Sequence, residues 1–374
     1  MARSTPRLID IAERAKLSVT SVSRILSGQR LSEYSVNTQE RVRNIAEELG
    51  WRPNLVVQGM KTGQTHTFGV FMAPYDTFWT GVLYGVHDTL LDAKQVPLVL
   101  WPHALVHPTV EPLSDEAWAA GGGSAVTHPP PSHEDTDGPN SAGSARRELS
   151  RINCLEDRRV DAIIAWPLHE ANARERLAAL SARGLPVVTI DDMLPDSAKS
   201  VYVGGDERAT MNTIRAHLEE LGHRRVAYFE FNTPHTWASR RREAFDQTWT
   251  EAAPTLALEQ LSGGRYDHDA INRYIQTHPD VTAVVAATDH VGRHVARALT
   301  ETGKRVPDDL SIVGYGNDLA GHGDIALTTV DQHPYEVGRA AAQIALNQLD
   351  TPDGMHLVPT TLLHRASTQP LVTP

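Results

Sequence analysis

The sequence has very little cysteine: Cys154 is the only one among 374 residues. A single cysteine excludes an intrachain disulfide and a zinc site built from several thiolates, which fits a protein of a reducing compartment. Long hydrophobic runs are also lacking, since no apolar stretch approaches the ~18 residues that a membrane-spanning helix needs. The first residues contain no apolar block typical of a signal peptide. We therefore expect neither membrane insertion nor export, and we place the protein in the cytoplasm.

The motifs of several common enzyme classes are absent as well. The chain has no Walker phosphate-binding sequence, no HExxH zinc motif and no GxSxG nucleophile elbow. Residues 314–316 form a GxG fragment, but neither a third glycine nor a phosphate-binding helix pattern follows it. We therefore predict that the protein is not an enzyme and that it carries no cofactor and no metal.

Charge is divided unevenly along the chain. Residues 1–64 contain 10 Lys and Arg against 6 Asp and Glu, a net charge of +4. The remaining residues contain 25 bases and 40 acids, a net charge of −15. A basic segment joined to an acidic body is typical of a protein whose one end contacts a polyanion, although a chance fluctuation gives the same pattern.

The first fifty residues have the spacing of three short amphipathic helices. Their apolar residues recur at helical intervals in three groups, which are Leu8, Ile11, Ala12 and Ala15, then Val22, Ile25 and Leu26, then Val42, Ile45, Ala46 and Leu49. Ser18 is placed to cap the second helix, and Asn37 with Glu40 fits a capping box at the third. Gly28 and Gly50 are placed to end these helices. Only two residues separate the first helix from Ser18, which predicts helix-turn-helix geometry.

From residue 68 onward, short apolar segments alternate with amphipathic ones. The expected strands are residues 68–72, 97–100, 162–165, 187–190, 226–229, 283–287 and 311–313, and helical patterns include residues 174–182, 209–221 and 291–299. This alternation is typical of parallel sheets covered by helices on both faces. Because about 300 residues exceed one comfortable sheet core, we predict an α/β fold with two lobes.

Residues 102–146 interrupt the alternation. Glycine and proline make up 12 of these 45 residues, and large apolar side chains are sparse. Such a segment cannot bury enough surface to offset its ordering entropy, so we expect a largely disordered surface insertion. Its histidines, His103, His107, His128 and His133, form either a metal site or part of a solvated loop, and their irregular spacing favours the loop.

The second helix of a helix-turn-helix lies in the major groove and presents its first residues to base edges. If Val22, Ile25 and Leu26 face inward, the outward positions are Val19, Thr20, Ser23 and Arg24. The planar fork of Arg24 suits guanine O6 and N7, Thr20 bonds several base edges, and Val19 suits a thymine methyl group. The hydroxyls of Ser21, Ser32, Ser35 and Thr38 suit phosphates. Helical hairpins with this spacing also occur as packing units, so the pattern alone leaves both interpretations open.

Several short sequence motifs of the chain together identify a family more specifically than the helix spacing does. They are Asp10-Ile11-Ala12, the run from Ala15 to Leu26, Leu49-Gly50-Trp51-Arg52-Pro53-Asn54, and residues 221–227, 306–315, 327–330 and 364–368. Together they resemble the lactose-repressor and galactose-repressor (LacI/GalR) family of bacterial transcription regulators. Apart from the insertion, the resemblance covers nearly the whole chain.

The resemblance implies three parts: a DNA-binding headpiece at residues 1–52, a hinge helix and linker at residues 53–64, and a two-lobed core at residues 65–374. The core would resemble periplasmic binding proteins, hold an effector between its lobes and dimerise. The resemblance also implies that Val19, Thr20 and Arg24 read bases and that Asn54, Val57 and Met60 of the hinge contact DNA. Met60 is either an apolar wedge in a minor-groove base step or an ordinary linker contact.

Three residues or segments of the headpiece depart from the family pattern. Lys16 replaces the usual turn glycine, and Gln39 stands where a basic phosphate contact is common. The turn after the second helix is two residues longer than in the lactose repressor. We expect these changes to lower DNA affinity without removing the base-reading face.

The resemblance also assigns residues to the effector cleft, which forms where strands of both lobes end. Arg241 matches the family arginine that bonds the effector. Without the resemblance, the sequence would indicate an ordinary arginine on the surface of a helix. Asp289 either contacts ligand or caps the next helix. The aromatic residues in loops that reach the cleft either stack on a ligand or pack in the core; they are Trp79, Trp166, Trp237 and Tyr266.

The cleft departs from a standard sugar site at three positions. Gly316 stands where many members have a hydroxyl-binding aspartate, Thr288 replaces a common asparagine, and His169 replaces an aspartate of the lactose repressor. We include His169 among the expected effector contacts. Because these polar residues differ from those of the family, the resemblance does not imply one particular effector. It implies only the class that family members usually bind, a sugar or sugar derivative.

We therefore expect a homodimeric regulator, a repressor, that binds double-stranded DNA at a pseudo-palindromic operator and responds to a small-molecule effector. The alternative is a solute-binding protein without a DNA role. That alternative requires export, for which the sequence shows no signal.

Overall fold

The chain forms two compact units, residues 1–65 and residues 66–374. The structure is a computed structural model that describes residues 6–53, 59, 63–72, 76–101, 142–166, 171–195, 199–233, 235–249, 253–259, 266–318 and 325–371. The expected hinge contacts Asn54, Val57 and Met60 lie outside the described residues.

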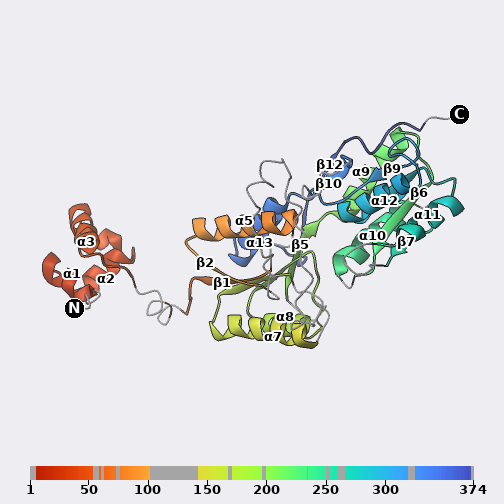
Figure 1. Cartoon of the computed structure of the whole chain (residues 1–374). Helices are drawn as coiled ribbons and strands as arrows, with labels where there is room; N and C mark the ends of the chain where they lie inside the picture. Colours follow the sequence, from red (N-terminus) through yellow and green to blue (C-terminus); the bar gives the residue numbers. More distant parts are fainter. Residues whose placement is uncertain are drawn as a thin grey trace, which may run out of the picture. The chain divides into compact units, whose positions relative to one another are not determined.

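Three helices of the first unit, labelled in Figure 1, pack around a small apolar core. They are α1 (Leu8–Ala15), α2 (Val19–Leu26) and α3 (Val36–Glu48), with a short 3-10 helix, η1 (Leu31–Glu33), between α2 and α3. Ile11, Val22, Ile25 and Val42 are buried in this core. The apolar spacing in the sequence therefore marks the face that each helix turns inward.

The helix ends agree with the sequence except at α3. Ser18 caps α2, because its side chain accepts a hydrogen bond from the backbone N–H of Ser21. Ser35 caps α3 in the same way, with the backbone N–H of Thr38 as donor. The predicted cap at Asn37 is wrong, because the chain is already helical at Val36.

Lys16 ends α1 with left-handed backbone angles, φ 53° and ψ 45°. This conformation favours glycine, and a residue with a side chain adopts it at a cost of about 1–2 kcal/mol. The turn therefore keeps the shape that the usual glycine would give it, at some cost in stability.

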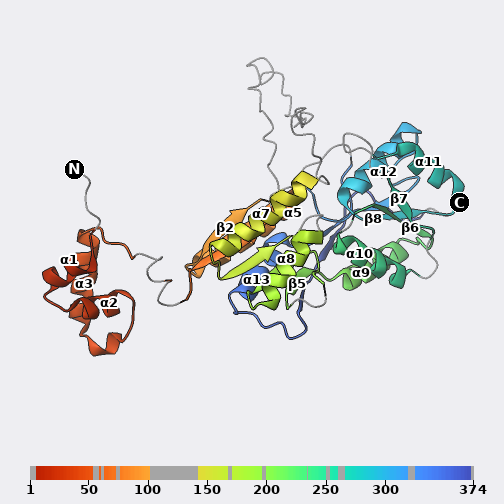
Figure 2. The same ribbon diagram turned by 90° about the horizontal axis from the view of Figure 1, so that it is seen from below.

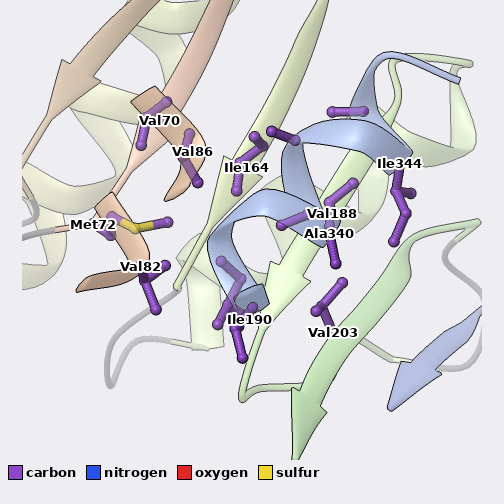
Figure 3. Packing of buried hydrophobic residues seen from close by; sticks show 14 of the residues in the cluster. Val70, Met72, Val82, Val86, Ile164, Val188, Ile190, Val203, Ala340 and Ile344 are labelled. Carbon is purple, nitrogen blue, oxygen red and sulfur yellow. The ribbon is translucent and has the colours of Figure 1, made fainter. Parts of the chain in front are cut away.

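The second unit consists of two α/β lobes, and the first lobe is built on a six-stranded parallel sheet. The strand order is β11 (Met355–Val358), β5 (Val201–Gly205), β4 (Val187–Ile190), β3 (Ala162–Ala165), β1 (Thr67–Phe71) and β2 (Val96–Leu100). Helices α5 (Thr77–Asp92) and α13 (Pro334–Ala345) cover one face, and α7 (Ala142–Asp157) and α8 (Ala171–Ala182) cover the other (Figure 1). Figure 3 shows Ile164 and Val188 of the sheet packed with Ala340 of α13.

The second lobe has a four-stranded parallel sheet. Its order is β7 (Leu256–Leu258), β6 (Val226–Phe231), β8 (Ala283–Ala286) and β9 (Ser311–Val313). Helices α9 (Glu207–Glu220) and α10 (Thr236–Thr248) pack on one face, and α11 (His268–Thr277) and α12 (Asp289–Glu301) pack on the other (Figure 2). Every residue of β8 and β9 is buried, which explains why these strands read as apolar runs.

The chain passes between the lobes several times. It leaves the first lobe after β5, and it returns from β9 through β10 (Thr329–Asp331) to α13. Strand β12 (Thr361–Leu363) pairs antiparallel with β10 and leads the chain back to the second lobe, where the backbone N–H of Ile312 bonds the Ser367 carbonyl. Each lobe is therefore assembled from segments far apart in the sequence.

The predicted strands are all present, with ends that differ by two residues at most, whereas β5, β7, β10, β11 and β12 were not predicted. Residues 102–141 of the expected insertion, including its four histidines, lie outside the described residues. The predicted end of the insertion at residue 146 is wrong, because α7 begins at Ala142. In the described parts of the chain, no helix is long and apolar enough to cross a membrane.

Candidate functional site

Helix α2 presents one face to solvent. Val22 and Ile25 are buried, whereas Val19 is 42% exposed and Thr20 is exposed. Arg24, one turn after Thr20, has a half-buried side chain. The structure thus places the three predicted base-reading residues on the open side of the helix, and their contact with DNA stays a prediction.

Of the predicted phosphate contacts, Ser21, Ser35 and Thr38 lie at two helix starts, whereas Ser32 lies in η1. The hydroxyls of Ser18 and Ser21 are 2.9 Å apart at the start of α2, and those of Ser35 and Thr38 are 2.8 Å apart at the start of α3. Hydroxyls and free backbone N–H groups at a helix N-terminus favour an anion. The arrangement is suited to phosphate binding at both helices. Ser23, half-buried on α2, lies beside this face.

Gln39 has a structural role in the loop between α2 and α3. Its side-chain amide nitrogen donates to the backbone carbonyls of Leu31 and Tyr34, at 3.0 Å each. Gln39, which stands where a basic phosphate contact is common, therefore holds the loop between α2 and α3 in place. Glu33 in that loop lies 3.6 Å from Arg24, measured from Oε2 to Nη1, and sequence reasoning did not select it.

A cavity of about 770 Å³ lies in the second unit, lined by residues of both lobes. Its walls come from the carboxyl ends of parallel strands: Trp166 follows β3, Asp191 follows β4, and Tyr315 comes two residues after β9. This is where two-lobed α/β proteins form ligand sites. The predicted residues Trp79, Trp237, Arg241 and Asp289 all line it.

One wall of the cavity is a stack of aromatic rings that continues from one lobe to the other. Trp79 and Trp166 of the first lobe stack with ring centroids 4.1 Å apart, and Trp166 stacks on His235 of the second lobe at 5.0 Å. Phe231 and Trp237 add apolar surface on the second lobe's side. An aromatic wall of this kind suits the apolar face of a ligand.

Arg241 is on the cavity wall, but its fork is already engaged. Its Nε and Nη2 donate to the Glu207 carboxylate at 3.0 and 2.9 Å, and Nη1 donates to the carbonyl oxygen of Ala287 at 2.7 Å. Both charged side chains are buried, and the guanidinium lies 3.4 Å from the Tyr315 ring centroid. The alternative of an exposed surface base is therefore wrong, and a contact with the effector stays a prediction.

The start of α12 resolves one alternative for Asp289. Thr288 is the N-cap, since its hydroxyl accepts from the backbone N–H of Val291, so a capping role for Asp289 is wrong. The Asp289 carboxylate accepts from the Thr329 hydroxyl at 2.6 Å and from the backbone N–H of Asp318 at 2.8 Å. Burial raises the pKa of Asp289 despite these hydrogen bonds. Asp289 thus holds the loop that follows β9 against the cavity.

The same loop explains the unusual glycine. Gly316 lines the cavity with φ +123°, a conformation that residues with side chains rarely adopt. Asp318, two residues later, supplies a carboxylate to the cavity and pairs with Arg293 at 2.6 Å. Its Oδ1 also accepts from the hydroxyl of Thr77, in the first lobe, at 3.4 Å. Asp318 is therefore a carboxylate of the cavity wall that sequence reasoning missed.

Two further carboxyl groups of the wall were also missed. Burial raises the pKa of Asp191 to about 7, although Arg241 opposes this shift. Burial raises the pKa of Asp76 as well, and the charge of Asp318 adds to the rise. Asp191 follows β4, and Asp76 follows β1 and precedes α5. Residues after the carboxyl ends of parallel strands line such a cleft, so both could have been selected once the strand order was known.

The two remaining predicted cleft residues are Tyr266 and His169. Tyr266 is buried in the core of the second lobe, where its ring packs against His290 and His294. It is absent from the described lining of the cavity, so the packing alternative describes it. His169 lies outside the described residues. No group of three or more His, Cys, Asp or Glu in the described ranges is arranged to hold a metal ion.

Comparisons with known proteins give two family matches. Residues 7–54 match bacterial regulatory proteins of the lacI family, and residues 216–368 match the periplasmic binding protein-like domain. The HTH-type transcriptional repressor PurR of Aliivibrio fischeri is 22% identical over 354 residues, which cover 92% of each chain. The HTH-type transcriptional regulator CelR of Thermobifida fusca is 25% identical over 380 residues, which cover 96% of this chain and 97% of CelR.

Solved structures share the architecture. The lac repressor dimer bound to operator and the anti-inducer ONPF has a TM-score of 0.67 at 20% identity, covering 98% of this chain and 100% of that one. A CelR–cellobiose complex has a TM-score of 0.59 at 21% identity, covering 97% and 100%. The chain therefore carries a LacI-family helix-turn-helix domain at residues 7–54, followed by a periplasmic binding protein-like domain at residues 216–368.

Proposed function

We propose that this protein is a homodimeric repressor that binds a specific DNA operator and changes its affinity when a small carbohydrate binds between the lobes of its core. The observation that carries the proposal is the presence, in one chain, of a lacI-type headpiece and a cavity lined by two lobes. The relatives' names describe transcriptional repressors and regulators. Such a protein works where the DNA is, so we propose a cytoplasmic location.

A homodimer carries two headpieces related by a twofold axis, which requires a pseudo-palindromic operator. Exposed apolar residues on the first lobe support dimerisation. Tyr84 and Leu91 of α5 are 62% and 48% exposed, and Val96 and Val99 of β2 are 50% and 39% exposed. Because β2 is an edge strand of its sheet, an uncovered apolar surface there favours association.

The cavity offers a physical route for regulation. A ligand that contacts Trp79 and Asp191 in the first lobe and Trp237 and Asp318 in the second changes the free energy of one lobe arrangement relative to another. We expect a coupling of about 1–3 kcal/mol between effector and operator. The hinge helix that the resemblance implies at residues 53–64 would transmit it, because so short a helix is only marginally stable and responds to small changes in geometry.

The lining of the cavity favours a neutral polyhydroxy ligand. Carboxylates accept hydrogen bonds from hydroxyls, and Asp76, Asp191, Asp289 and Asp318 supply them. Arg241 is neutralised by Glu207, so an anionic ligand would meet an excess of acidic groups. A thermal-shift screen tests this with neutral sugars and their phosphorylated or acidic counterparts. We expect a neutral sugar to raise the melting temperature, since a ligand at 100 times its Kd adds about 2.7 kcal/mol; stabilisation by the anions alone contradicts the proposal.

The DNA role is tested by selecting preferred duplexes from a randomised pool and measuring their affinities for Arg24→Ala. We expect this variant to lose about 1–3 kcal/mol of binding free energy and its preference at one base pair in each half-site. Arg43→Ala, a change at an exposed position of α3, is the control and should keep that preference. An equal loss for Arg24→Ala on every sequence would show that Arg24 does not read a base.

Removal of residues 1–65 separates the two halves of the proposal. Because residues 66–374 form a compact unit of their own, the truncated protein should keep its thermal shift with the effector and lose operator binding. If the full chain shows no sequence preference on DNA while it binds the sugar, the protein is a solute-binding protein.

A further inference from the structure

The loop between α2 and α3 is held in a defined position beside α2, the recognition helix of the proposed DNA-binding function. It includes η1, whose backbone is closed by hydrogen bonds from Glu33 N–H to the Arg30 carbonyl and from Tyr34 N–H to the Leu31 carbonyl. The Gln39 side chain fastens the loop to α3 through the carbonyls of Leu31 and Tyr34. Tyr34 also packs against the headpiece core. Glu33 is therefore carried by a fixed piece of backbone.

The Glu33 carboxylate lies between two arginines. Its Oε2 is 3.6 Å from Nη1 of Arg24, and its Oε1 accepts a hydrogen bond from Nη1 of Arg30 at 3.3 Å. The side chains of Arg24, Arg30 and Glu33 are 37%, 65% and 46% exposed. An acid at a surface that must approach phosphates weakens attraction to DNA, so its presence beside the base-reading arginine calls for another role.

That role follows from how an arginine recognises guanine. The guanidinium must present two donors in one plane to O6 and N7, and a flexible side chain loses rotamer entropy when it does so. A carboxylate that attracts Nη1 limits the orientations of the fork and leaves its other edge, Nε and Nη2, to bond a base. Arg30 offsets the negative charge of Glu33, so the three side chains together keep a net positive charge.

We propose that Glu33, placed by the long loop against Arg24, is a positioning residue that sharpens the base preference of the recognition helix. This inference rests on the proposed DNA-binding function. It concerns specificity rather than affinity, because Glu33 acts through Arg24 and itself adds repulsion to the phosphates.

The experiment uses the full-length protein and the operator selected for it, with duplexes substituted at each base pair of a half-site. The Kd of each duplex is measured by fluorescence anisotropy at one salt concentration. Arg24→Ala first identifies the pair that Arg24 reads. At that pair, we expect Glu33→Gln to reduce discrimination about two- to fivefold, the effect of an exposed ion pair worth up to ~1 kcal/mol. In the Arg24→Ala background, Glu33→Gln should change nothing further at that pair.

Two further variants distinguish the effect of the position of the Glu33 carboxylate from the effect of its charge. Glu33→Asp keeps the charge but withdraws the carboxylate by one methylene group, and we expect it to lose discrimination at the same pair. Glu48→Gln removes the same charge from the exposed Arg14–Glu48 pair, 2.7 Å long, and should leave the base preference unchanged. Unchanged melting curves in circular dichroism show that each variant is folded.

Other outcomes overturn the inference. An equal effect of Glu33→Gln on all duplexes shows that only its charge matters, and a changed preference at another base pair shows that Glu33 reads a base itself. A gain in discrimination shows that Glu33 competes with DNA for Arg24. If the unaltered protein prefers no sequence, the proposed function fails, a result distinct from these three.

Discussion

The carboxyl group of Asp191 is buried in the cavity wall, and its environment changes its ionisation. Burial raises its pKa from 3.8 to about 7, while nearby Arg241 acts in the opposite direction. Below the pKa of the unfolded chain, both states hold the proton. Between about pH 4 and pH 7 the folded state keeps a proton that the unfolded state releases, so stability falls as pH rises through this range.

Asp191→Asn should remove this dependence. We expect the variant to be more stable than the unaltered protein at pH 8, by up to about 4 kcal/mol for a pKa raised from 3.8 to about 7, and equally stable near pH 4. Thermal denaturation across this pH range measures the difference. Asp353→Asn, at an exposed carboxylate, is the control. A constant gain at every pH would contradict the prediction.

Single residues differed in how well the sequence predicted them. The cap at Ser18 was predicted because capping is local, and the cap at Asn37 was wrong because Ser35 offered an earlier start. Tyr266 was expected in the cleft because the sequence places it in a loop, yet its side chain is buried in the core of the second lobe. Local chemistry predicts a cap, but only packing decides where a loop side chain lies.

At the scale of elements, α5 and α13 pack with their backbones in close approach. They lie about 250 residues apart in the sequence and meet over the sheet of the first lobe (Figure 1). A side chain at Gly338 would bring its Cβ to 2.0 Å from the carbonyl oxygen of Val82, and one at Gly85 would lie 2.1 Å from that of Tyr335. Glycine on both helices allows this contact.

Gly338→Ala should force the two helices apart. We expect a loss of about 1–3 kcal/mol or more in the stability of the core, because backbone atoms cannot move aside as a flexible side chain does. Gly205→Ala is the control, since its Cβ would meet nothing nearer than 3.5 Å. The melting temperatures of both variants check this, and equal values would contradict it.

At the scale of the whole core, Asp192 joins the lobes. It is fully buried after β4, pairs with Arg174 of the first lobe, and accepts from His235 at 3.1 Å and from the Thr236 hydroxyl at 2.7 Å in the second. Burial alone would raise the pKa of Asp192, but the hydrogen bonds from His235, Arg174 and Thr236 lower it. Its contribution to stability is therefore present above the pKa of the unfolded chain and is lost as pH falls through the folded value.

Asp192→Asn should weaken the contact between the lobes. We expect the free energy of unfolding to fall by roughly 3–5 kcal/mol at neutral pH, because the change leaves Arg174 without the opposite charge of Asp192. In acid, where Asp192 is protonated in the unaltered protein, we expect a smaller difference. Thermal denaturation measures the loss, and small-angle X-ray scattering detects separation of the lobes as a larger radius of gyration. Asp246→Asn, in an exposed pair with Arg242, should cost less than about 1 kcal/mol. A variant as stable as this control would contradict the prediction.

The sequence by itself determined the three headpiece helices, the outward position of Val19, Thr20 and Arg24, and the buried strands, because apolar spacing and caps act over a few residues. Only the tertiary structure decided that Glu207 holds Arg241, that Asp318 pairs with Arg293 at the cavity wall, and that α13 returns to the first lobe. These contacts join residues tens to hundreds of positions apart. Local patterns do not predict such contacts, because the chain between the partners must fold before they can meet.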